Sequence, residues 1–341
     1  MTISVAIASA MSDWAAEFAE WTARRGTRVA IDPPALLDRG EPHPRSTSGK
    51  ISANGSCELI ATRDGWIAVN LARATDRSAL DAWVGQHDTA NPWPAVRAAA
   101  AHRSSQELVD LARLLGMPVA IVGEVRSQRQ ALQSIVCGVR KLERATFDVL
   151  DLTSMWAGPL CGELLTRAGA SVTKVESRAR PDGIRLGSPA LYKRLNTRKL
   201  QVVIDFESAV ALNWLRARMV TADVVLTSAR PRAFTQLGID TETIFDGNPG
   251  LVWVAVSGYG WTGDAPDRVA FGDDAAAAGG LVDWVDGEPH FHGDAVADPL
   301  TGIAAAVGAL RALDQGGGVL VDAPLAVIAA DVARRSVQTP Q

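Results

Sequence analysis

The segment FDVLDLTSMWAGPLCGELLTRAGASVTKVE, residues 147–176, decides the fold prediction. Its apolar run Phe147–Leu152 is typical of a buried strand, Cys161–Ala168 is compatible with a helix, and Val172–Glu176 is a second strand-like run. A strand, a helix and a strand at this spacing form a βαβ unit, in which the two strands are parallel. The segment therefore predicts a parallel sheet covered by helices.

The same alternation continues toward the end of the chain. Further strands are predicted at Leu200–Asp205, Val224–Thr227, Leu251–Ser257 and Val319–Asp322, and further helices at Ser208–Val220 and Leu300–Leu313. We therefore expect an α/β fold with a Rossmann-like parallel sheet domain over residues 146–341. Ligands of such sheets bind outside the carboxyl ends of the strands, so chemistry is expected in the loops that follow them.

Residues 1–145 predict a smaller α+β domain in front of this sheet. A strand is expected at Ile3–Ala8, and a helix at Asp13–Arg25 because Trp14, Phe18 and Trp21 recur at helical spacing. Residues 32–55 are rich in Pro, Gly and Ser, which predicts an exposed connector. Whether the first 50 residues complete the sheet or pack on a partner chain is left open.

The rest of this part has recognisable turn and cap signals. Strands Cys57–Thr62 and Trp66–Leu71 flank Asp64-Gly65, which predicts a hairpin. A capping box of Ser104 and Glu107 predicts the start of a helix. The predicted helices are Asp76–Gly85 and Ser104–Leu115, and a short strand is predicted at Val119–Val122.

Composition limits the classes of function. The 341 residues carry 34 Lys and Arg against 38 Asp and Glu, with 47% hydrophobic residues, which is typical of a globular protein and not of a nucleic-acid binder. Cys57, Cys137 and Cys161 show no paired spacing, which suggests reduced thiols. No signal peptide or membrane segment is expected, since runs such as Gly302–Leu310 are too short to span a bilayer. We expect a cytoplasmic protein.

Three common site types are not favoured. His290, His292 and Asp294 form an HxHxD run, but no further ligand follows at a recognisable interval, so surface histidines and no metal are expected. The Gly158-Pro159 turn lacks the GxGxxG pattern of a dinucleotide site, and Pro159 has no N–H to offer a pyrophosphate. A serine hydrolase is not favoured either, because GxSxG is absent.

Asp298 stands immediately before a helical run, with Pro299 after it. The plain structural interpretation is a helix cap, with Asp at N-cap and Pro at N1. A carboxylate in that place is expected to stay ionised at pH 7, because the helix dipole favours the anion. Such a carboxylate can attack a thioester carbonyl and form a covalent intermediate.

Nine motifs then follow one another in a fixed order. They are VLDLTSMWAGP (149–159), LLTRAGASVTKVE (164–176), RPDGIR (180–185), NTRK (196–199), VIDF (203–206), ADVVL (222–226), RP (230–231) with QLG (236–238), NPGLVWVAVSGYG (248–260) and ADPLTG (297–302). Together they resemble the class III CoA-transferases, the family of formyl-CoA transferase, carnitine CoA-transferase and α-methylacyl-CoA racemase. The resemblance covers roughly residues 146–335.

The resemblance also implies an unusual order of parts. In the family the Rossmann-like segment normally begins the chain and a smaller α+β domain follows. Here residues 56–122 resemble that smaller domain and stand in front, so the chain resembles a circularly permuted member. Family members are dimers of interlocked chains, so a homodimer is expected, with interlocking left open.

The site implied by the resemblance centres on Asp298, which would attack an acyl-CoA and become an aspartyl-CoA thioester before a carboxylic acid takes over the CoA. Coenzyme A is then a substrate, and no other cofactor is expected. The implied CoA-binding residues are Trp156, Ala157, Arg178, Ile204, Asp205, Ser228, Ala229, Arg230, Ala270, Phe271 and Gly272. The glycines Gly258, Gly260, Gly279 and Gly280 are candidates to admit backbone oxyanion donors, with ordinary turns as the alternative.

Three departures from the family pattern bear on the reaction. Trp156 replaces a residue that is often small or an amide, Gln236 replaces an arginine used for CoA phosphate, and Gly272 replaces the histidine of the racemase branch. Loss of that histidine favours transfer over racemisation. The alternatives are an acyl-CoA racemase or isomerase, with Asp298 and Asp273 or Asp274 as bases, and a CoA-binding protein without turnover.

Overall fold

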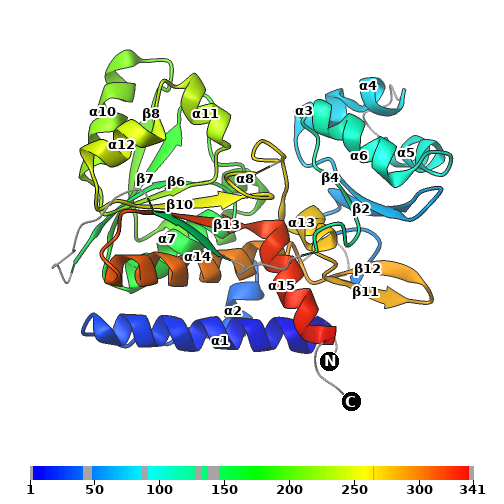
Figure 1. Cartoon of the computed structure of the whole chain (residues 1–341). Coiled ribbons are helices and arrows are strands. Elements are labelled where there is room, and N and C mark those ends of the chain that lie inside the picture. The colour runs from blue at the N-terminus through cyan, green and yellow to red at the C-terminus, as the bar shows by residue number, and fades with distance from the viewer. Residues whose placement is uncertain are drawn as a thin grey trace.

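The computed structural model describes residues 3–40, 48–85, 91–126, 132–136, 146–263 and 265–337. Its centre is a seven-stranded sheet with the order β5-β13-β10-β9-β6-β7-β8 (Figure 1). The strands are β5 (Gln133–Val136), β6 (Asp148–Leu152), β7 (Ser171–Ser177), β8 (Leu200–Ile204), β9 (Val224–Thr227), β10 (Val252–Ser257) and β13 (Val319–Pro324). Every neighbouring pair is parallel except β5 with β13. The predicted α/β fold class is confirmed.

The order of the strands creates a crevice between β6 and β9. From β6 the chain builds outward through β7 and β8, and it then returns to the other side of β6 with β9, β10 and β13. Loops after β6 and β9 therefore diverge at their carboxyl ends, which is where ligands of open α/β sheets bind. The two loops touch, because the N–H of Ser154 donates to Oγ of Ser228 over 3.2 Å.

Helices cover both faces of the sheet. α10 (Ala209–Thr221), α11 (Pro231–Gln236) and α12 (Thr241–Gly247) lie on one side, and α7 (Ala157–Arg167) and α14 (Ala297–Asp314) lie on the other (Figure 1). α7 and α14 approach closely at Gly302, where a β-carbon would lie 2.8 Å from the carbonyl oxygen of Ala157. A glycine is needed there, and the contact brings the first turns of the two helices together.

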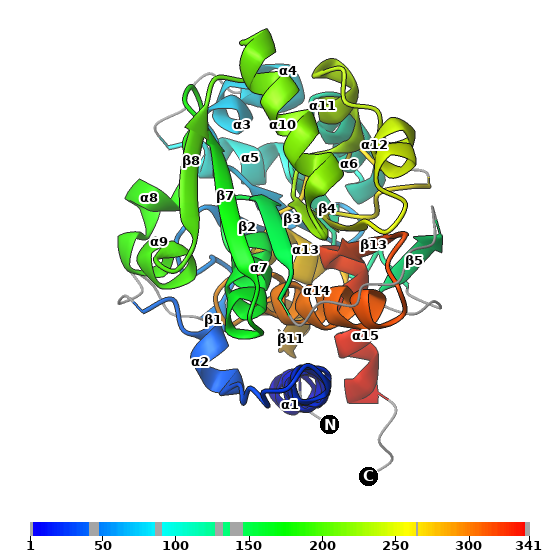
Figure 2. The same cartoon turned by 90° about the vertical axis from the view of Figure 1, so that its left-hand side faces the viewer.

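The strand predicted at Ile3–Ala8 is wrong, because these residues begin the helix α1 (Ile3–Arg24). The alternation of Ile3, Val5 and Ile7 resembles a strand, yet Ile7 also starts a buried helical stripe with Met11 and Phe18. α1 packs along α14 and against α15 (Leu325–Val337), and Figure 2 shows it end-on beneath that layer. The front of this chain therefore packs on the large sheet unit.

The small antiparallel sheet contains β2 (Cys57–Ala61), β3 (Trp66–Asn70) and β4 (Val119–Ile121). The predicted hairpin is confirmed by the pairing of Cys57 with Asn70 and of Ala61 with Trp66. Its helices are α3 (Ala74–Ser78), α4 (Leu80–Val84), α5 (Trp93–Ala100) and α6 (Ser105–Leu114). The helix predicted at 76–85 is thus two short helices that meet at Ala79.

The capping box predicted for α6 is half present. Oγ of Ser104 accepts from the N–H of Glu107 over 3.2 Å, but the Glu107 carboxylate pairs with Arg103 instead.

A third sheet joins β1 (Ser48–Gly49), β12 (Glu288–His292) and β11 (Val282–Val285). β1 pairs with β12, which ties the front of the chain to the strand that leads toward Asp298.

The remaining helices are α2 (Pro33–Leu37), α8 (Ile184–Gly187), α9 (Pro189–Asn196) and α13 (Gly272–Ala278). α2 lies within the predicted connector, so that stretch is partly structured.

A domain division near residue 145 stays a prediction, and residue 145 itself lies outside the described residues. Cys57 and Cys161 are buried and unbridged, and Cys137 also lies outside the described part. Within the described ranges, no helix is long and apolar enough to cross a membrane.

Candidate active site

Asp298 is the second residue of α14, so the prediction that it caps this helix is wrong. The N-cap is Val296, and the N–H of Asp298 already donates to the carbonyl of Ala295 over 2.8 Å. The helix begins two residues earlier than expected, so the Asp298 carboxylate lies in the first turn of α14 without capping it. It accepts a hydrogen bond from the backbone N–H of Ala157, the first residue of α7. The carboxylate thus faces the positive ends of two helices.

The partly buried Asp298 carboxyl opens onto a pocket of about 60 Å³ beside the loop that follows β6. The volume is enough for a reacting carboxyl group and too small for a long chain. The pocket is lined by Arg39, Asn54, Ser56, Asn70, Ala72, Met155, Trp156, Ile184, Phe271, Gly272, Asp273, Ala295 and Asp298. Four residues implied by the family resemblance, Trp156, Phe271, Gly272 and Asp298, are brought together here.

Backbone strain is concentrated around this pocket. Met155 has a φ of 70° and Ala295 a φ of 47°, and they are two of the three non-glycine residues with positive φ in the described chain. The N–H of Met155 donates to Oδ1 of Asp182 over 3.0 Å, and the N–H of Ala295 donates to Oδ1 of Asp273 over 2.9 Å. Strained residues that their surroundings hold in place are typical of functional sites.

Two carboxyl groups in the pocket have strongly raised pKa values. Burial and the neighbouring charge of Asp273 raise the pKa of Asp298 to about 7, against the opposing effect of Arg39. Burial and the charge of Asp294 raise the pKa of Asp273 to about 7 as well. The expectation of a fully ionised Asp298 at pH 7 is therefore corrected, because burial outweighs the helix dipoles.

Arg39 lines this pocket, and the sequence analysis did not single it out. Its Nε lies 2.6 Å from Oδ2 of Asp294 and its Nη2 lies 2.9 Å from Oδ1. Its guanidinium carbon stands 4.9 Å from the centroid of the Trp156 ring. Arg39 follows α2 in the stretch predicted to be an exposed connector, and no motif there marks it.

The HxHxD run does not gather around one point. Asp294 pairs with Arg39, whereas Nδ1 of His292 lies 2.6 Å from Oδ2 of Asp283. Across the described residues, no group of three or more His, Cys, Asp or Glu side chains is arranged to hold a metal ion.

Two buried lysines fix the loop that carries Trp156. Nζ of Lys199 contacts Oδ2 of Asp151 at 2.7 Å and the carbonyl of Pro159 at 2.8 Å. Nζ of Lys174 contacts the carbonyl of Thr153 at 2.8 Å and Oδ2 of Asp182 at 3.2 Å. Buried ion pairs with this many hydrogen bonds hold one geometry firmly, and they support the N-terminus of α7.

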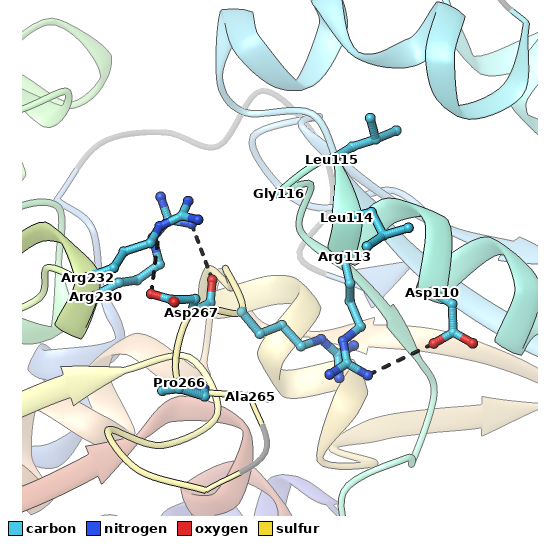
Figure 3. Close-up of a pocket in the computed structure, with 11 residues that line it drawn as sticks. Asp110, Arg113, Leu114, Leu115, Gly116, Arg230, Arg232, Ala265, Pro266 and Asp267 are labelled. Atoms are coloured by element: carbon cyan, nitrogen blue, oxygen red, sulfur yellow. Dashed lines mark hydrogen bonds and ion pairs between the residues drawn. The ribbon is translucent and has the colours of Figure 1, made fainter.

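A larger cavity of about 590 Å³ lies between α6 and the loops that follow β9 and β10. Figure 3 shows Arg230 and Arg232 on one side and Arg113 and Asp110 of α6 on the other. Its lining is Asp110, Arg113, Leu114, Leu115, Gly116, Arg230, Arg232, Ala265, Pro266, Asp267 and Arg268. Four arginines against two aspartates make this cavity a suitable site for a polyanion.

Arg73 connects the two sites. Its Nη2 donates to the carbonyl of Gly116, in the wall of the large cavity, over 2.8 Å. Its guanidinium carbon also stands 5.7 Å from the ring centroid of Phe271, which lines the Asp298 pocket. One side chain therefore borders both the arginine-lined cavity and the pocket of the carboxyl group.

The other residues implied by the resemblance are more scattered. Arg230 lines the large cavity, while Arg178 is exposed after β7 and its N–H donates to the carbonyl of Ile204. Outside the linings of the two cavities lie Ala157, Arg178, Ile204, Asp205, Ser228, Ala229 and Ala270. Ala157 acts on the site through its N–H, and Ser228 through the loop contact with Ser154.

The four candidate oxyanion glycines also lie outside the lining of the Asp298 pocket. A β-carbon on Gly279 would lie 2.5 Å from the backbone nitrogen of Ala330 in α15, so this glycine permits close helix packing. Gly280 and Gly260 have positive φ values of 75° and 135°. Gly258 lies against the carbonyl of Arg268, 2.9 Å from where a β-carbon would stand.

Comparison with known proteins places the second part of the chain. Residues 145–339 match the family model of CoA-transferase family III. A succinyl-CoA–D-citramalate CoA-transferase of Chloroflexus aurantiacus is 34% identical over 188 residues, 51% of this chain and 47% of that protein. A succinate–glutarate CoA-transferase of Agrobacterium fabrum is 29% identical over 206 residues, 54% of this chain and 52% of that protein.

A solved structure agrees. The protein Rv3272 of Mycobacterium tuberculosis superposes with a TM-score of 0.52 at 28% identity, covering 59% of each chain. The chain spans about half the length of the curated relatives that it matches.

Proposed function

The chain belongs to CoA-transferase family III, and from this premise we propose that it transfers CoA from an acyl-CoA thioester to a carboxylic acid with Asp298 as the nucleophile. The observation that carries the proposal is the environment of that carboxyl group. It faces a pocket beside the loop that follows β6, accepts from the N–H of Ala157, and lies against a glycine that leaves it room.

The two cavities suit the two ends of CoA. The arginines of the large cavity are placed to bind the phosphates of CoA, and the pantetheine arm would pass Arg73 to bring the thioester to Asp298. Arginine is suited to phosphate because its fork donates two parallel hydrogen bonds. The named relatives act on succinyl-CoA and succinate, so short acids are the first substrates to test.

The reaction proceeds by four exchanges at carbonyl carbons. A carboxylate oxygen of Asp298 attacks the acyl carbon and the C–S bond breaks, giving a mixed anhydride and CoA thiolate. The thiolate attacks Cγ of Asp298 and releases the donor acid, which leaves an aspartyl-CoA thioester. The acceptor carboxylate then attacks Cγ and expels the thiolate. Finally the thiolate attacks the acyl carbon of the new anhydride, which forms the product and regenerates Asp298.

The N–H of Ala157 has a defined task in this sequence. It already donates to the carboxylate of Asp298. When Cγ becomes tetrahedral, the same donor at the start of α7 faces the developing oxyanion. Stabilisation of the transition state thus needs no rearrangement of α7, whose first turn is packed against α14.

Trapping of the intermediate tests the proposal. After incubation with succinyl-CoA alone, hydroxylamine should convert the Asp298 side chain to a hydroxamate, detected by mass spectrometry of its peptide. Asp298→Asn should give none, and the control Asp246→Asn, an exposed carboxyl on α12, should give the wild-type yield. A wild-type protein that binds CoA but yields no hydroxamate would be a binding protein without turnover.

A second candidate, an acyl-CoA isomerase, is favoured by one observation. Asp273 and Asp298 line the same pocket, and both have a pKa of about 7, which suits proton exchange at an α-carbon. In this case deuterium from the solvent should enter the α-position of an acyl-CoA without any acceptor acid. Transfer without such exchange excludes the isomerase.

We also propose the permuted order of parts, since the sheet β2-β3-β4 precedes the segment that matches the family. Superposition of residues 48–126 on the part of Rv3272 left uncovered checks this, and absence of a counterpart contradicts it. A homodimer and a cytoplasmic location stay predictions, and sedimentation of the purified protein tests the former.

A further inference from the structure

Arg39 stands out among the residues of the Asp298 pocket because of its charge. Among the described lining residues it is the one cation, beside the carboxyl groups of Asp273 and Asp298. It lies outside the segment, residues 145–339, that matches the family. A carboxylic acid that enters this pocket as an anion meets like charges unless a cation faces it.

The geometry leaves part of the guanidinium available. Asp294 engages Nε and Nη2, so Nη1 is the nitrogen that this carboxylate does not hold. The Asp294 pair and the ring of Trp156 fix the plane of the group, and the Arg39 side chain is 17% exposed. A guanidinium held in this way keeps its remaining N–H groups in one place, which favours recognition of a carboxylate.

Trp156 supplies an independent observation. Its indole Nε1 is buried and has no hydrogen-bond partner in the described structure, although Trp156 itself lines the pocket. Buried N–H groups are normally paired, and an exception calls for an acceptor. The guanidinium of Arg39 lies over the ring of Trp156, so an anion bound to Arg39 would lie beside this indole.

We infer that Arg39 and the indole N–H of Trp156 form a carboxylate subsite, which holds the acceptor acid for its attack on the aspartyl thioester. The inference rests on the proposed function and names the recognition element for its second substrate. In the attack, an acceptor oxygen bonds to Cγ of Asp298 and the C–S bond breaks, with the electron pair leaving on sulfur. The same subsite receives the donor acid when it departs, since the two acids occupy equivalent positions.

The test compares two acceptors that differ in charge. The aspartyl-CoA thioester is formed from succinyl-CoA, and its decay is followed with glutarate, an anion, or with hydroxylamine, a neutral nucleophile. Arg39→Gln should slow the reaction with glutarate about 10-fold to 100-fold, as expected for a lost charge-assisted hydrogen bond. The reaction with hydroxylamine should change less than about 2-fold. Equal slowing with both acceptors, or none with glutarate, overturns the inference.

Matched variants separate recognition from stability. Arg97→Gln also removes the partner of a buried carboxylate, Glu58, but neither Arg97 nor Glu58 belongs to the lining of either cavity. It should leave the glutarate reaction unchanged. If Arg39→Gln does not fold, the double variant Arg39→Gln with Asp294→Asn removes the buried charge together with its partner. Trp156→Phe keeps an aromatic ring beneath Arg39 but removes the indole N–H. It should slow the reaction of the thioester with glutarate and leave the reaction with hydroxylamine unchanged.

Direct binding makes the result independent of turnover. Calorimetry of glutarate with Asp298→Asn, compared with Asp298→Asn carrying Arg39→Gln, should show the binding lost in the second protein. If wild type forms no thioester, the proposed function fails and the calorimetry still decides the role of Arg39. If the thioester forms, and glutarate reacts with it equally fast in wild type and in Arg39→Gln, then only the assignment of the subsite fails.

Discussion

The β-carbon that Gly272 lacks would stand 2.4 Å from Oδ2 of Asp298. The same atom would lie 2.5 Å from the carbonyl oxygen of Ala295, so the first turn of α13 closes directly onto the carboxyl group. A residue with any side chain at position 272 would have to displace the carboxyl group of Asp298 or the backbone of Ala295.

Gly272→Ala should lower the rate of transfer by about 100-fold, because a displacement of the nucleophile by about 1 Å has an effect of that order. Stability should fall as well, since the Ala295 carbonyl is part of the backbone. The control is Gly187→Ala, where a β-carbon meets nothing within 4 Å. Wild-type turnover in Gly272→Ala would show that Asp298 moves freely.

The rate of thioester formation should rise between about pH 6 and 8, with its midpoint near the pKa of Asp298, about 7. The carboxyl group is protonated below that pH and cannot attack. Asp273→Asn removes a charge that raises this pKa, so the midpoint should shift to lower pH. Stopped-flow or quenched measurements with succinyl-CoA alone give the profile, and an unshifted midpoint would contradict the coupling.

The contribution of Asp273 to the free energy of unfolding should fall as pH rises from about 4 to 7. The pKa of Asp273 is raised from 3.8 to about 7, so over this interval the native state binds more protons than the unfolded state. Urea unfolding of Asp273→Asn should therefore show a flatter pH dependence than wild type. Asp246→Asn, at an exposed site, is the control and should follow the wild-type curve.

Arg230→Gln should raise the KM for acyl-CoA about 10-fold, since a hydrogen bond to a charged group is lost. The KM for an acyl-pantetheine that lacks the nucleotide phosphates should stay the same. Steady-state kinetics with both donors checks this. Arg126→Gln, exposed and outside the cavity, should change neither value. An equal rise in KM for both donors would contradict the placement of the CoA phosphates in the arginine-lined cavity.

Lys199→Met should lower the free energy of unfolding by about 3–5 kcal/mol, because it leaves the buried Asp151 without its partner. Denaturant unfolding measures the loss. Lys193→Met, on the exposed face of α9, should change it by less than about 0.5 kcal/mol. A small effect at Lys199 would mean that the loop before α7 is held by other contacts.

The local pattern of apolar residues was enough to predict the strands of the sheet. The strand at Val224–Thr227 has the predicted bounds, and the Asp64-Gly65 turn joins the predicted hairpin. It failed at Ile3–Ala8 because alternating apolar residues also fit one face of a helix when the stripe continues beyond them. The helix start at Asp298 was misplaced by two residues, since Asp-Pro is a strong cap signal and the burial of Ala297 is not visible in sequence.

The candidate site could be predicted only in part. Motif order pointed to Asp298, Trp156 and Gly272, which share one pocket. Arg39 could not be found, because its position depends on packing between segments about 255 residues apart in the chain. The raised pKa of Asp298 also depends on Asp273 and Asp294, which only the folded chain brings near it.

Every residue of α14 from Ala304 to Leu310 is buried, and most of these residues are alanine or glycine. A helix packed this closely is not expected to tilt against its neighbours to accommodate different acids. Selection for a new substrate is therefore expected to change the segments that carry Trp156 and Arg39, and to leave α14, which carries Asp298, unaltered. Mutant libraries that aim at a new substrate should therefore keep residues 297–310 unchanged and vary the segments around Trp156 and Arg39.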